Sequence, residues 1–394
     1  MNAIALTALL VAASAPEPLV WLGATRGESL QSLHTAARRY VHPEGPSLLI
    51  VGVAHLGDEA YYDDIEDLLS EADVVVYEAV LSEGARPPGG LDNEARARST
   101  EASLRFLADA MGELDDPPAD MKAMADALVS RHRVLANIAG ALQNDGWGNS
   151  VEIITDASGT RLRSLGADGA LGGRDWASDI EVSVPVDAGP AQSLQAELAE
   201  ALRLRFQLSQ LPYEQPHWVL GDMSAEEVSR RLSGGGGTIE LGGLLTGSSL
   251  SGQMAMGLVR MLPSIDAFSG GRAIDGLRLL MIEMLSNRKL VEEGVSLYGE
   301  QLEQVILHDR NDAAVEEVMR QAAARAGDET IGLIYGAAHM KGIDEALQQK
   351  GWTPIDTRWL AAISVDLDAS NLTADDVDAM REWSKMAGSM FGGQ

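Results

Sequence analysis

The chain has 394 residues, of which 45% are hydrophobic and 23% charged, a composition typical of a globular protein and not of a disordered one. Its 59 acidic and 30 basic residues leave a formal net charge of -29. A protein with this negative charge repels nucleic-acid phosphates and anionic lipid head groups, so nucleic acid is not an expected partner. The absence of cysteine excludes disulfides and thiolate metal sites, which leaves histidine and carboxylate side chains as metal ligands.

The first fifteen residues, MNAIALTALLVAASA, form an apolar run that ends in Ala13-Ser14-Ala15. This pattern matches the hydrophobic segment and cleavage site of a secretory signal, but it lacks the positive n-region and fits a buried first strand or helix equally well. A signal would make the protein secreted or periplasmic, and its absence would make it cytoplasmic. No later stretch has about 20 uninterrupted apolar residues, so we expect no membrane-spanning helix. We treat residues 16–394 as a single domain.

The first third of the chain predicts a helix followed by a β-α-β unit. SLQSLHTAARRY at 29–40 has apolar residues at helical intervals and predicts a helix. A strand from Ser47 to Val53, a helix over 60–70 and a strand from Asp73 to Tyr77 then form the β-α-β unit. Glu78 stands at the end of its second strand.

The middle of the chain predicts insertions into this α/β framework. Residues 145–190, rich in Gly, Asp and Ser, predict an inserted hairpin and loop region. Residues 191–300 predict a helical insertion, with Ser224 as an N-cap supported by Glu227, and with Met-rich helices that form core or a surface for a protein partner. The predicted helical segments are 100–144 with a break near 115–118, 192–211, 224–232, 251–263 and 272–292, and a glycine linker is predicted at 234–237.

The last third repeats the opening pattern. A helix from Leu302 to Ala323 precedes a strand at 330–335, a helix at 343–350 and a strand at 352–359. We interpret residues 47–80 and 330–360 as two β-α-β half-repeats of one central sheet, so the predicted fold is α/β with a large, mainly helical insertion.

Each predicted half-repeat carries Gly-x-x-His at the end of its first strand, with His55 in GVAH and His339 in GAAH. Carboxyl ends of parallel strands meet at one sheet edge, so we expect both imidazoles and Glu78 to converge there. Two histidines and one carboxylate are the usual ligands of a catalytic divalent metal, here Mn²⁺, Co²⁺, Zn²⁺ or Fe²⁺. The alternative is that each histidine bonds backbone carbonyls and that Glu78 caps a turn or pairs with an arginine.

Taken together, GVAH at 52–55, VVVYEAV at 74–80, DRN at 309–311 and IYGAAHMKGI at 334–343 resemble the TraB/GumN/Tiki family, which is related more distantly to erythromycin-esterase-like and ChaN-like groups. The resemblance covers about residues 47–80 and 302–360. It implies an α/β core of paired repeats and, from the Tiki members, a metal-dependent peptidase that uses His55, His339 and Glu78, with Arg310 as the accompanying arginine. Tiki proteins are membrane-anchored, whereas this sequence has no such anchor, so their substrate is not transferred.

The sequence leaves three functions open. The leading hypothesis is a metal-dependent hydrolase of peptides or small acyl compounds, in which Arg310 stabilises the charge that develops on the attacked oxygen. The others are a non-catalytic metal- or ligand-binding protein and a regulator that docks a partner on its Met-rich helices. Secondary candidates for the site, each with a structural alternative, are His217, Asp222, Tyr61, Tyr62, Asp356 and Arg358, and Asp58 and Glu59 are expected to favour a helix N-terminus.

Overall fold

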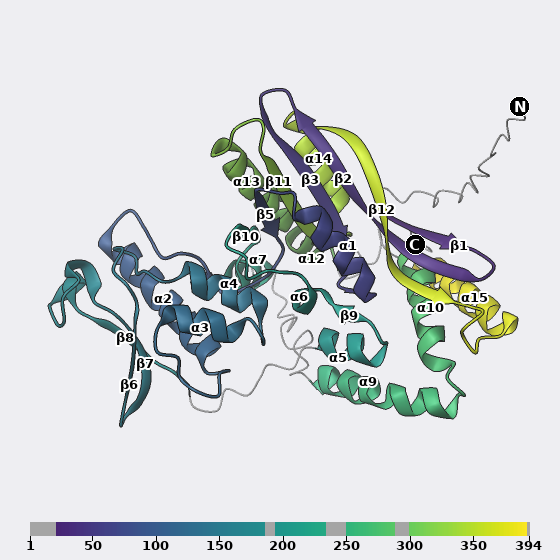
Figure 1. The fold of residues 1–394 in the computed structure, drawn as a ribbon, viewed down its shortest axis with the longest axis horizontal. Coiled ribbons are helices and arrows are strands. Elements are labelled where there is room, and N and C mark those ends of the chain that lie inside the picture. The colour runs from purple at the N-terminus through teal and green to yellow at the C-terminus, as the bar shows by residue number, and fades with distance from the viewer. Residues whose placement is uncertain (1–20, 186–193, 234–249, 288–298, 392–394) are drawn as a thin grey trace, which may run out of the picture.

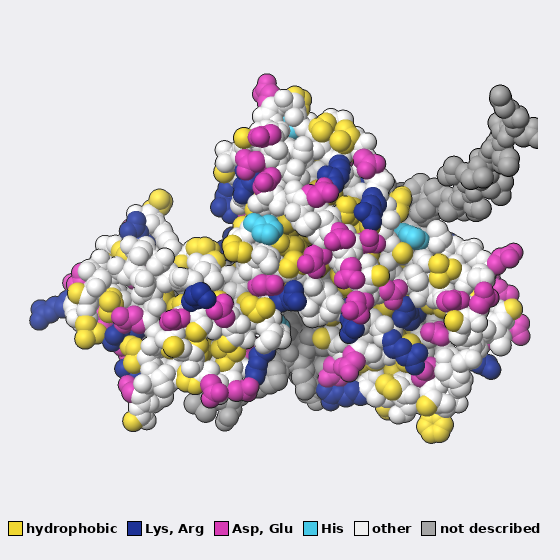
Figure 2. Space-filling model, in the orientation of Figure 1, with side chains coloured by type: hydrophobic (Ala, Val, Ile, Leu, Met, Phe, Trp, Pro, Cys, Tyr) yellow, Lys and Arg dark blue, Asp and Glu magenta, His cyan; other side chains and the backbone are white. Residues whose placement is uncertain are grey.

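The structure, a computed structural model, describes residues 21–185, 194–233, 250–287 and 299–391 (Figure 1). The predicted signal at 1–15 and the glycine run at 234–237 lie outside these ranges. Within them, no helix is both long and apolar enough to cross a membrane. Figure 2 shows acidic side chains scattered over the face in view, among basic and hydrophobic ones, in keeping with the net charge of -29.

A mixed seven-stranded sheet forms the centre of the molecule, in agreement with the predicted α/β fold (Figure 1). The strands run in the order β1-β2-β3-β11-β5-β10, and β12 also pairs with β2. The four strands from β3 to β10 are parallel, whereas β1, β2 and β12 pair antiparallel. Their bounds are β1 Leu22–Arg26, β2 Leu30–His42, β3 Gly45–Val53, β5 Val74–Tyr77, β10 Trp218–Leu220, β11 Thr330–Gly336 and β12 Thr353–Asp366.

Both faces of the parallel strands are covered by helices. In β3, Leu49 and Val51 pack on the face that carries α1 and α10, while Leu48 and Ile50 pack on the face that carries α13 and α14. Strands buried on both faces read as continuous apolar runs, which is why these strands were recognisable in the sequence. The covering helices are α1 Glu59–Leu69, α10 Ala273–Leu285, α13 Arg310–Ala323 and α14 Met340–Gln349.

A helical lobe with its own apolar core lies beside the sheet edge formed by β10 (Figure 1). Leu104, Met124, Ile138 and Leu162 belong to that core. The strands predicted near 151–154 and 180–184 are present, and β7 joins them into a three-stranded antiparallel sheet. The elements of the lobe are α2 Asn93–Met111, α3 Met121–Leu128, α4 Arg133–Ala141, β6 Glu152–Asp156, β7 Gly159–Ser164 and β8 Ile180–Ser183.

The helix predicted over 192–211 ends at Ala201. It is followed by strand β9, which pairs with β4, and by the short helix α6. The Ser224 hydroxyl accepts a hydrogen bond from the Glu227 amide, as an N-cap does. The remaining elements are β4 Leu56–Gly57, α5 Leu194–Ala201, β9 Arg205–Phe206, α6 Gln207–Gln210, α7 Ala225–Ser233, α9 Leu250–Phe268, α12 Glu300–Glu303, a π-helical segment Gln304–Asp309, α15 Ala374–Phe391, and 3₁₀ turns at Glu83–Ala85, Gly166–Asp168 and Asp175–Ala177.

The predicted Met-rich helices correspond to α9 and α10. Helix α10 buries Ile274, Leu279 and Ile282 in the molecule, whereas α9 exposes Met261 and Phe268. The expected protein partner on these helices stays a prediction.

The helix predicted over 29–40 is wrong, because this segment is strand β2. Four of its residues, Leu33, Ala36, Ala37 and Tyr40, are buried and stand at positions i, i+3, i+4 and i+7. They alternate between the two faces: Leu33 and Ala37 belong to one core and Ala36 and Tyr40 to the other. Because this strand is buried on both faces, its apolar residues have the same spacing in the sequence as those of an amphipathic helix.

The second predicted half-repeat also differs from the structure. β12 runs antiparallel to β2 instead of lying parallel to β11, and β11 is inserted between β3 and β5. Asp356 and Arg358 on β12 are exposed, and Arg358 pairs with Asp64 at 2.9 Å. Neither residue occupies a position like that of Glu78, because their strand is separated from β5 by three others.

Candidate metal centre

Three of the predicted site residues lie at one edge of the sheet. In the parallel register Gly336 is opposite Val53, and Ile334 is opposite Tyr77, so β3, β11 and β5 end side by side. His55, His339 and Glu78 each follow one of these ends. The glutamate and His339 are buried, while His55 is exposed.

Gly336, the last residue of β11, is the point around which these side chains gather. A methyl group built on Gly336 would lie 3.2 Å from Glu78 Oε2, 3.5 Å from His55 Nε2 and 3.6 Å from His339 Cδ2. Glu78 Oε2 and His55 Nε2 are therefore within 6.7 Å of each other, the sum of 3.2 and 3.5 Å. His339 Nε2 lies 3.6 Å from Glu78 Oε1. The space beside the missing Cβ is thus bordered by two imidazoles and a carboxylate.

Both imidazoles are held at Nδ1 by the side-chain oxygen of an amide. His55 Nδ1 lies 2.8 Å from Gln207 Oε1, and His339 Nδ1 lies 2.8 Å from Asn311 Oδ1. An amide oxygen only accepts, so in each pair Nδ1 carries a proton, and in the neutral ring Nε2 then keeps its lone pair. Metal-bound histidines are usually held in this way by their second nitrogen.

The loop that carries His55 is fixed on either side of the residue. The Tyr61 hydroxyl accepts a hydrogen bond from the Ala54 amide at 3.0 Å, and the Tyr62 hydroxyl donates to the Ala54 carbonyl at 2.9 Å. The amide of Gln207 donates to the His55 carbonyl at 2.9 Å. Tyr61 and Tyr62 are buried and support the backbone of the site instead of facing a substrate.

Arg310, at the start of α13, connects Glu78 to a second buried carboxylate. Its Nη2 donates to Glu78 Oε1 at 2.6 Å and to Asp222 Oδ2 at 2.7 Å, and its Nε donates to Asp222 Oδ1 at 2.9 Å. The amide of Gly336 donates to Glu78 Oε2 at 2.6 Å. Nη1 of Arg310 has no hydrogen-bond partner among the residues that the structure describes, so it is available to a bound molecule.

These contacts set the charges of the site. Burial by itself raises the pKa of Glu78, but His339 in its protonated form, the Arg310 guanidinium and the Gly336 amide favour the carboxylate and lower that pKa to about 2. Burial lowers the pKa of His339 to about 4, although Glu78 opposes this shift. Burial disfavours the charge of Arg310, yet the hydrogen bonds and charge of Asp222 raise its pKa above the usual value. At neutral pH the site therefore holds an ionised carboxylate, a neutral His339 and a cationic Arg310.

Two imidazoles and a carboxylate are side chains that bind divalent cations. The hydrogen bonds of both Nδ1 atoms, with Gln207 and Asn311, leave the Nε2 atoms as the ligand atoms. Ligand atoms about 2.1 Å from one ion lie at most about 4.2 Å apart, a limit that the 3.6 Å between His339 Nε2 and Glu78 Oε1 satisfies. Among the described residues, however, no group of three or more His, Asp or Glu side chains is placed so that it could hold a metal ion together. Both Glu78 oxygens are bonded to Arg310 and Gly336, and His55 stands at the exposed rim.

Of the secondary candidates, Asp222 joins the buried charges of the site as the bidentate partner of Arg310, and Tyr61 and Tyr62 hold the backbone beside His55. His217 precedes β10 at the opposite edge of the sheet, where its carbonyl accepts from the Val75 amide. Asp58 occupies the N-cap position of α1, but its carboxylate accepts hydrogen bonds from the Ser364 amide and from Arg278 instead of capping the helix.

Sequence reasoning assigned no role to Gln207 or Asn311. Asn311 is the last residue of the DRN run, and its place beside Arg310 was the available signal. Gln207 lies in FQLSQ, within a segment predicted as continuous helix, and nothing in its pattern pointed to the site.

A cavity of about 900 Å³ lies elsewhere, between α3, α4, β10 and α13. Its walls are mainly apolar and include Ile138, Trp218 and Leu220. None of the three proposed ligands lines it, so this cavity does not contribute to the candidate metal centre.

Comparison of the chain with models of known protein families, with curated proteins and with solved structures finds no match.

Proposed function

We propose that this chain is a divalent-metal-dependent hydrolase that acts on peptides or other small acyl compounds. The observation that carries the proposal is the pair of imidazoles with Nδ1 bonded to an amide oxygen and with Nε2 left for a ligand, placed around Gly336 beside an ionised Glu78. The resemblance of the Gly-x-x-His motifs to the TraB/GumN/Tiki family supports the same reading.

In this proposal His55 and His339 hold the cation through Nε2, and Glu78 contributes a carboxylate oxygen. A bound divalent ion supplies Lewis-acid chemistry and lowers the pKa of a coordinated water to about 7. Arg310 is oriented by Asp222 and Glu78, and its Nη1 donates to the substrate oxygen on which negative charge develops. The all-nitrogen-and-oxygen ligand set is compatible with Mn²⁺, Co²⁺, Zn²⁺ and Fe²⁺.

Elemental analysis tests the metal part of this proposal. We expect purified protein, dialysed against each metal, to retain about one equivalent, and His55→Ala and His339→Ala to lose it while remaining folded by circular dichroism. His217→Ala, at the opposite sheet edge, is the matched control and should keep the metal. Absence of a retained or tightly bound metal in the parent protein would overturn the proposal.

Hydrolysis is tested on quenched-fluorescence peptide libraries and on acyl esters, with metal added and with chelator. We expect cleavage that depends on metal, on both histidines and on Arg310. Arg310→Lys keeps the charge but not the bidentate geometry with Asp222, so it should lower the rate far more than the metal content.

The second candidate function is metal or ligand binding without turnover. It is favoured by one observation: both Glu78 oxygens already accept strong hydrogen bonds, from Arg310 and from the Gly336 amide. A fourth ligand from Asp356 or His217 would have closed the coordination shell of such a protein, but both lie away from the site. Stoichiometric metal without cleavage of any library would favour this function.

A further inference from the structure

We infer that Gln207 is the positioning residue of His55, which it holds in the Nδ1-protonated tautomer with Nε2 turned toward Gly336. This inference rests on the proposed function, because it concerns one of its three metal ligands. It extends the site beyond the motif-bearing segments, since Gln207 lies in α6, within the predicted helical insertion of residues 191–300.

Two hydrogen bonds join Gln207 to His55. The Gln207 amide donates to the His55 carbonyl at 2.9 Å, and Gln207 Oε1 lies 2.8 Å from His55 Nδ1. The adjacent residues pair as strands, with Phe206 opposite Leu56 and Arg205 opposite Gly57. The backbone pairing fixes the distance between the two segments, and the side-chain bond then fixes the rotation of the imidazole.

The other end of the Gln207 amide is also held. Its Nε2 lies 2.7 Å from the Tyr213 hydroxyl, and both side chains are buried, with 1% of Gln207 exposed. A buried amide that lost either partner would leave a polar group unsatisfied, so the amide has little freedom to turn away. His55 itself is exposed, so packing does not fix the orientation of its ring, and the hydrogen bond with Gln207 does.

At the second imidazole, His339, Asn311 makes the same kind of contact, an amide oxygen against Nδ1. Its Oδ1 lies 2.8 Å from His339 Nδ1, the same distance as in the Gln207 pair. The two histidines thus have equivalent supports, one within the DRN run and one supplied by the segment between α5 and β10. The opposite orientation of the Gln207 amide would place Nε2 against His55 and force the ring proton onto its Nε2, where no cation can bind.

The tautomer can be measured without metal. In long-range ¹H–¹⁵N spectra of metal-free, ¹⁵N-labelled protein near pH 8, we expect His55 to show the Nδ1–H pattern. Gln207→Met should convert much of it to the Nε2–H pattern, and Gln207→Glu, which keeps an acceptor oxygen toward the ring, should restore Nδ1–H. Gln210→Met, three positions along the same helix, is the matched control and should leave the spectrum unchanged.

Calorimetric titration with Zn²⁺ or Mn²⁺ supplies the second readout. Loss of a supporting contact to a metal-bound histidine typically costs 10–100-fold in affinity, and we expect a loss of that size for Gln207→Met but not for Gln210→Met. In a His55→Ala background the same substitution should have no further effect on affinity.

The two proposals fail in different ways. If the parent protein shows His55 as Nε2–H, or if Gln207→Met leaves the tautomer unchanged in folded protein, the assignment of Gln207 is wrong whatever the metal data show. If the tautomer responds as expected but no metal binds, the positioning contact stands and the proposed function fails.

Discussion

Arg310 and Glu78, 232 positions apart in the sequence, form a buried ion pair with Nη2 and Oε1 separated by 2.6 Å. The pair does not stand alone, because Asp222 takes two further hydrogen bonds from the same guanidinium. Two carboxylates and one arginine leave a net negative charge next to His339 and His55. That charge favours a cation at this position over an anion, which agrees with the proposed metal centre.

Asp222→Asn should destabilise the protein and misplace Arg310. Removing one partner of a buried, hydrogen-bonded charge typically costs about 3–5 kcal/mol, and Asp222 is 1% exposed. We therefore expect the free energy of unfolding, measured with urea, to fall by that order. Asp356→Asn on β12, which is exposed, should change it by less than about 0.5 kcal/mol. Equal effects of the two substitutions would contradict the role given to Asp222.

The parallel strands and the convergence of His55, His339 and Glu78 could be predicted because they depend on local patterns. Each strand is a short apolar run followed by glycine or a polar residue, and the ends of parallel strands meet at one edge. The strand order was not predictable in the same way. No local feature of 330–336 shows that β11 is inserted between β3 and β5, since that choice is made by packing between distant segments.

The errors at β2 and at Gln207 have related causes. In β2, burial on both faces removed the alternation by which a strand is normally recognised, and tertiary pairing overrode the apparent helical period. At Gln207 the role comes from a contact with a residue 152 positions away, and a single glutamine in an apolar segment carries no mark of it. Sequence patterns therefore identified the proposed ligands but not the residues that orient them.

Gly336→Ala should impair metal binding more than stability. The added methyl group would lie 3.2 Å from Glu78 Oε2 and 3.5 Å from His55 Nε2, in the space that the ligands share. We expect at least about a tenfold loss of metal affinity by calorimetry, with a change in the free energy of unfolding of at most about 2 kcal/mol. Gly140→Ala, in α4, meets no atom within 4 Å and should leave affinity unchanged while slightly stabilising its helix. Undiminished metal affinity in Gly336→Ala would show that this space is not used.

The metal-free protein should lose stability as the pH falls from 6.5 to about 4. His339 in the folded protein has a pKa of about 4 because it is buried, whereas in the unfolded chain it takes up a proton near 6.5. The contribution of the neutral His339 to the free energy of unfolding is complete above pH 6.5. It declines as the unfolded state becomes protonated and is lost in full below about pH 4. The difference of about 2.5 between the pKa of His339 in the unfolded chain and in the folded protein corresponds to a loss of about 3 kcal/mol in the free energy of unfolding.

Urea unfolding between pH 4 and 7, with chelator present, measures this dependence. His339→Gln should be less stable at pH 7, because it removes a buried, hydrogen-bonded ring, but its stability should fall less steeply toward pH 4. Parallel curves for the parent protein and the variant would show that His339 is not the group responsible. Glu78, with its pKa lowered to about 2, adds a separate loss only below about pH 4.5.

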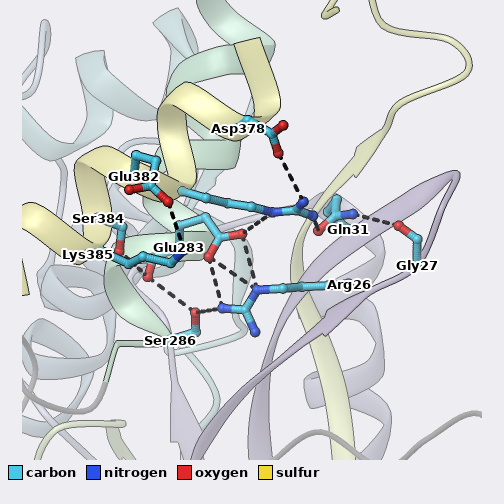
Figure 3. A network of polar contacts seen from close by, with 10 residues as sticks. Arg26, Gly27, Gln31, Glu283, Ser286, Asp378, Glu382, Ser384 and Lys385 are labelled. Atoms are coloured by element: carbon cyan, nitrogen blue, oxygen red, sulfur yellow. Dashed lines mark hydrogen bonds and ion pairs between the residues drawn. The ribbon is translucent and has the colours of Figure 1, made fainter. Parts of the chain in front are cut away.

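Glu283 on α10 should be required for the attachment of the C-terminal helix α15. Glu283 is 5% exposed, its carboxylate accepts a hydrogen bond from Arg26 at 2.9 Å, and its carbonyl accepts one from the Ser384 hydroxyl at 2.9 Å (Figure 3). The carboxylate also accepts a hydrogen bond from Arg381 at 3.4 Å. β1, α10 and α15 thus meet at one buried charge. Glu283→Gln removes the charge while both arginines remain partly solvated, so we expect a loss of about 1–3 kcal/mol and faster amide exchange in α15. Glu382→Gln, whose partner Lys385 is exposed, should change neither quantity measurably. Unchanged exchange in α15 of the Glu283 variant would mean that apolar contacts, such as that of the buried Val377, hold this helix without the ionic network.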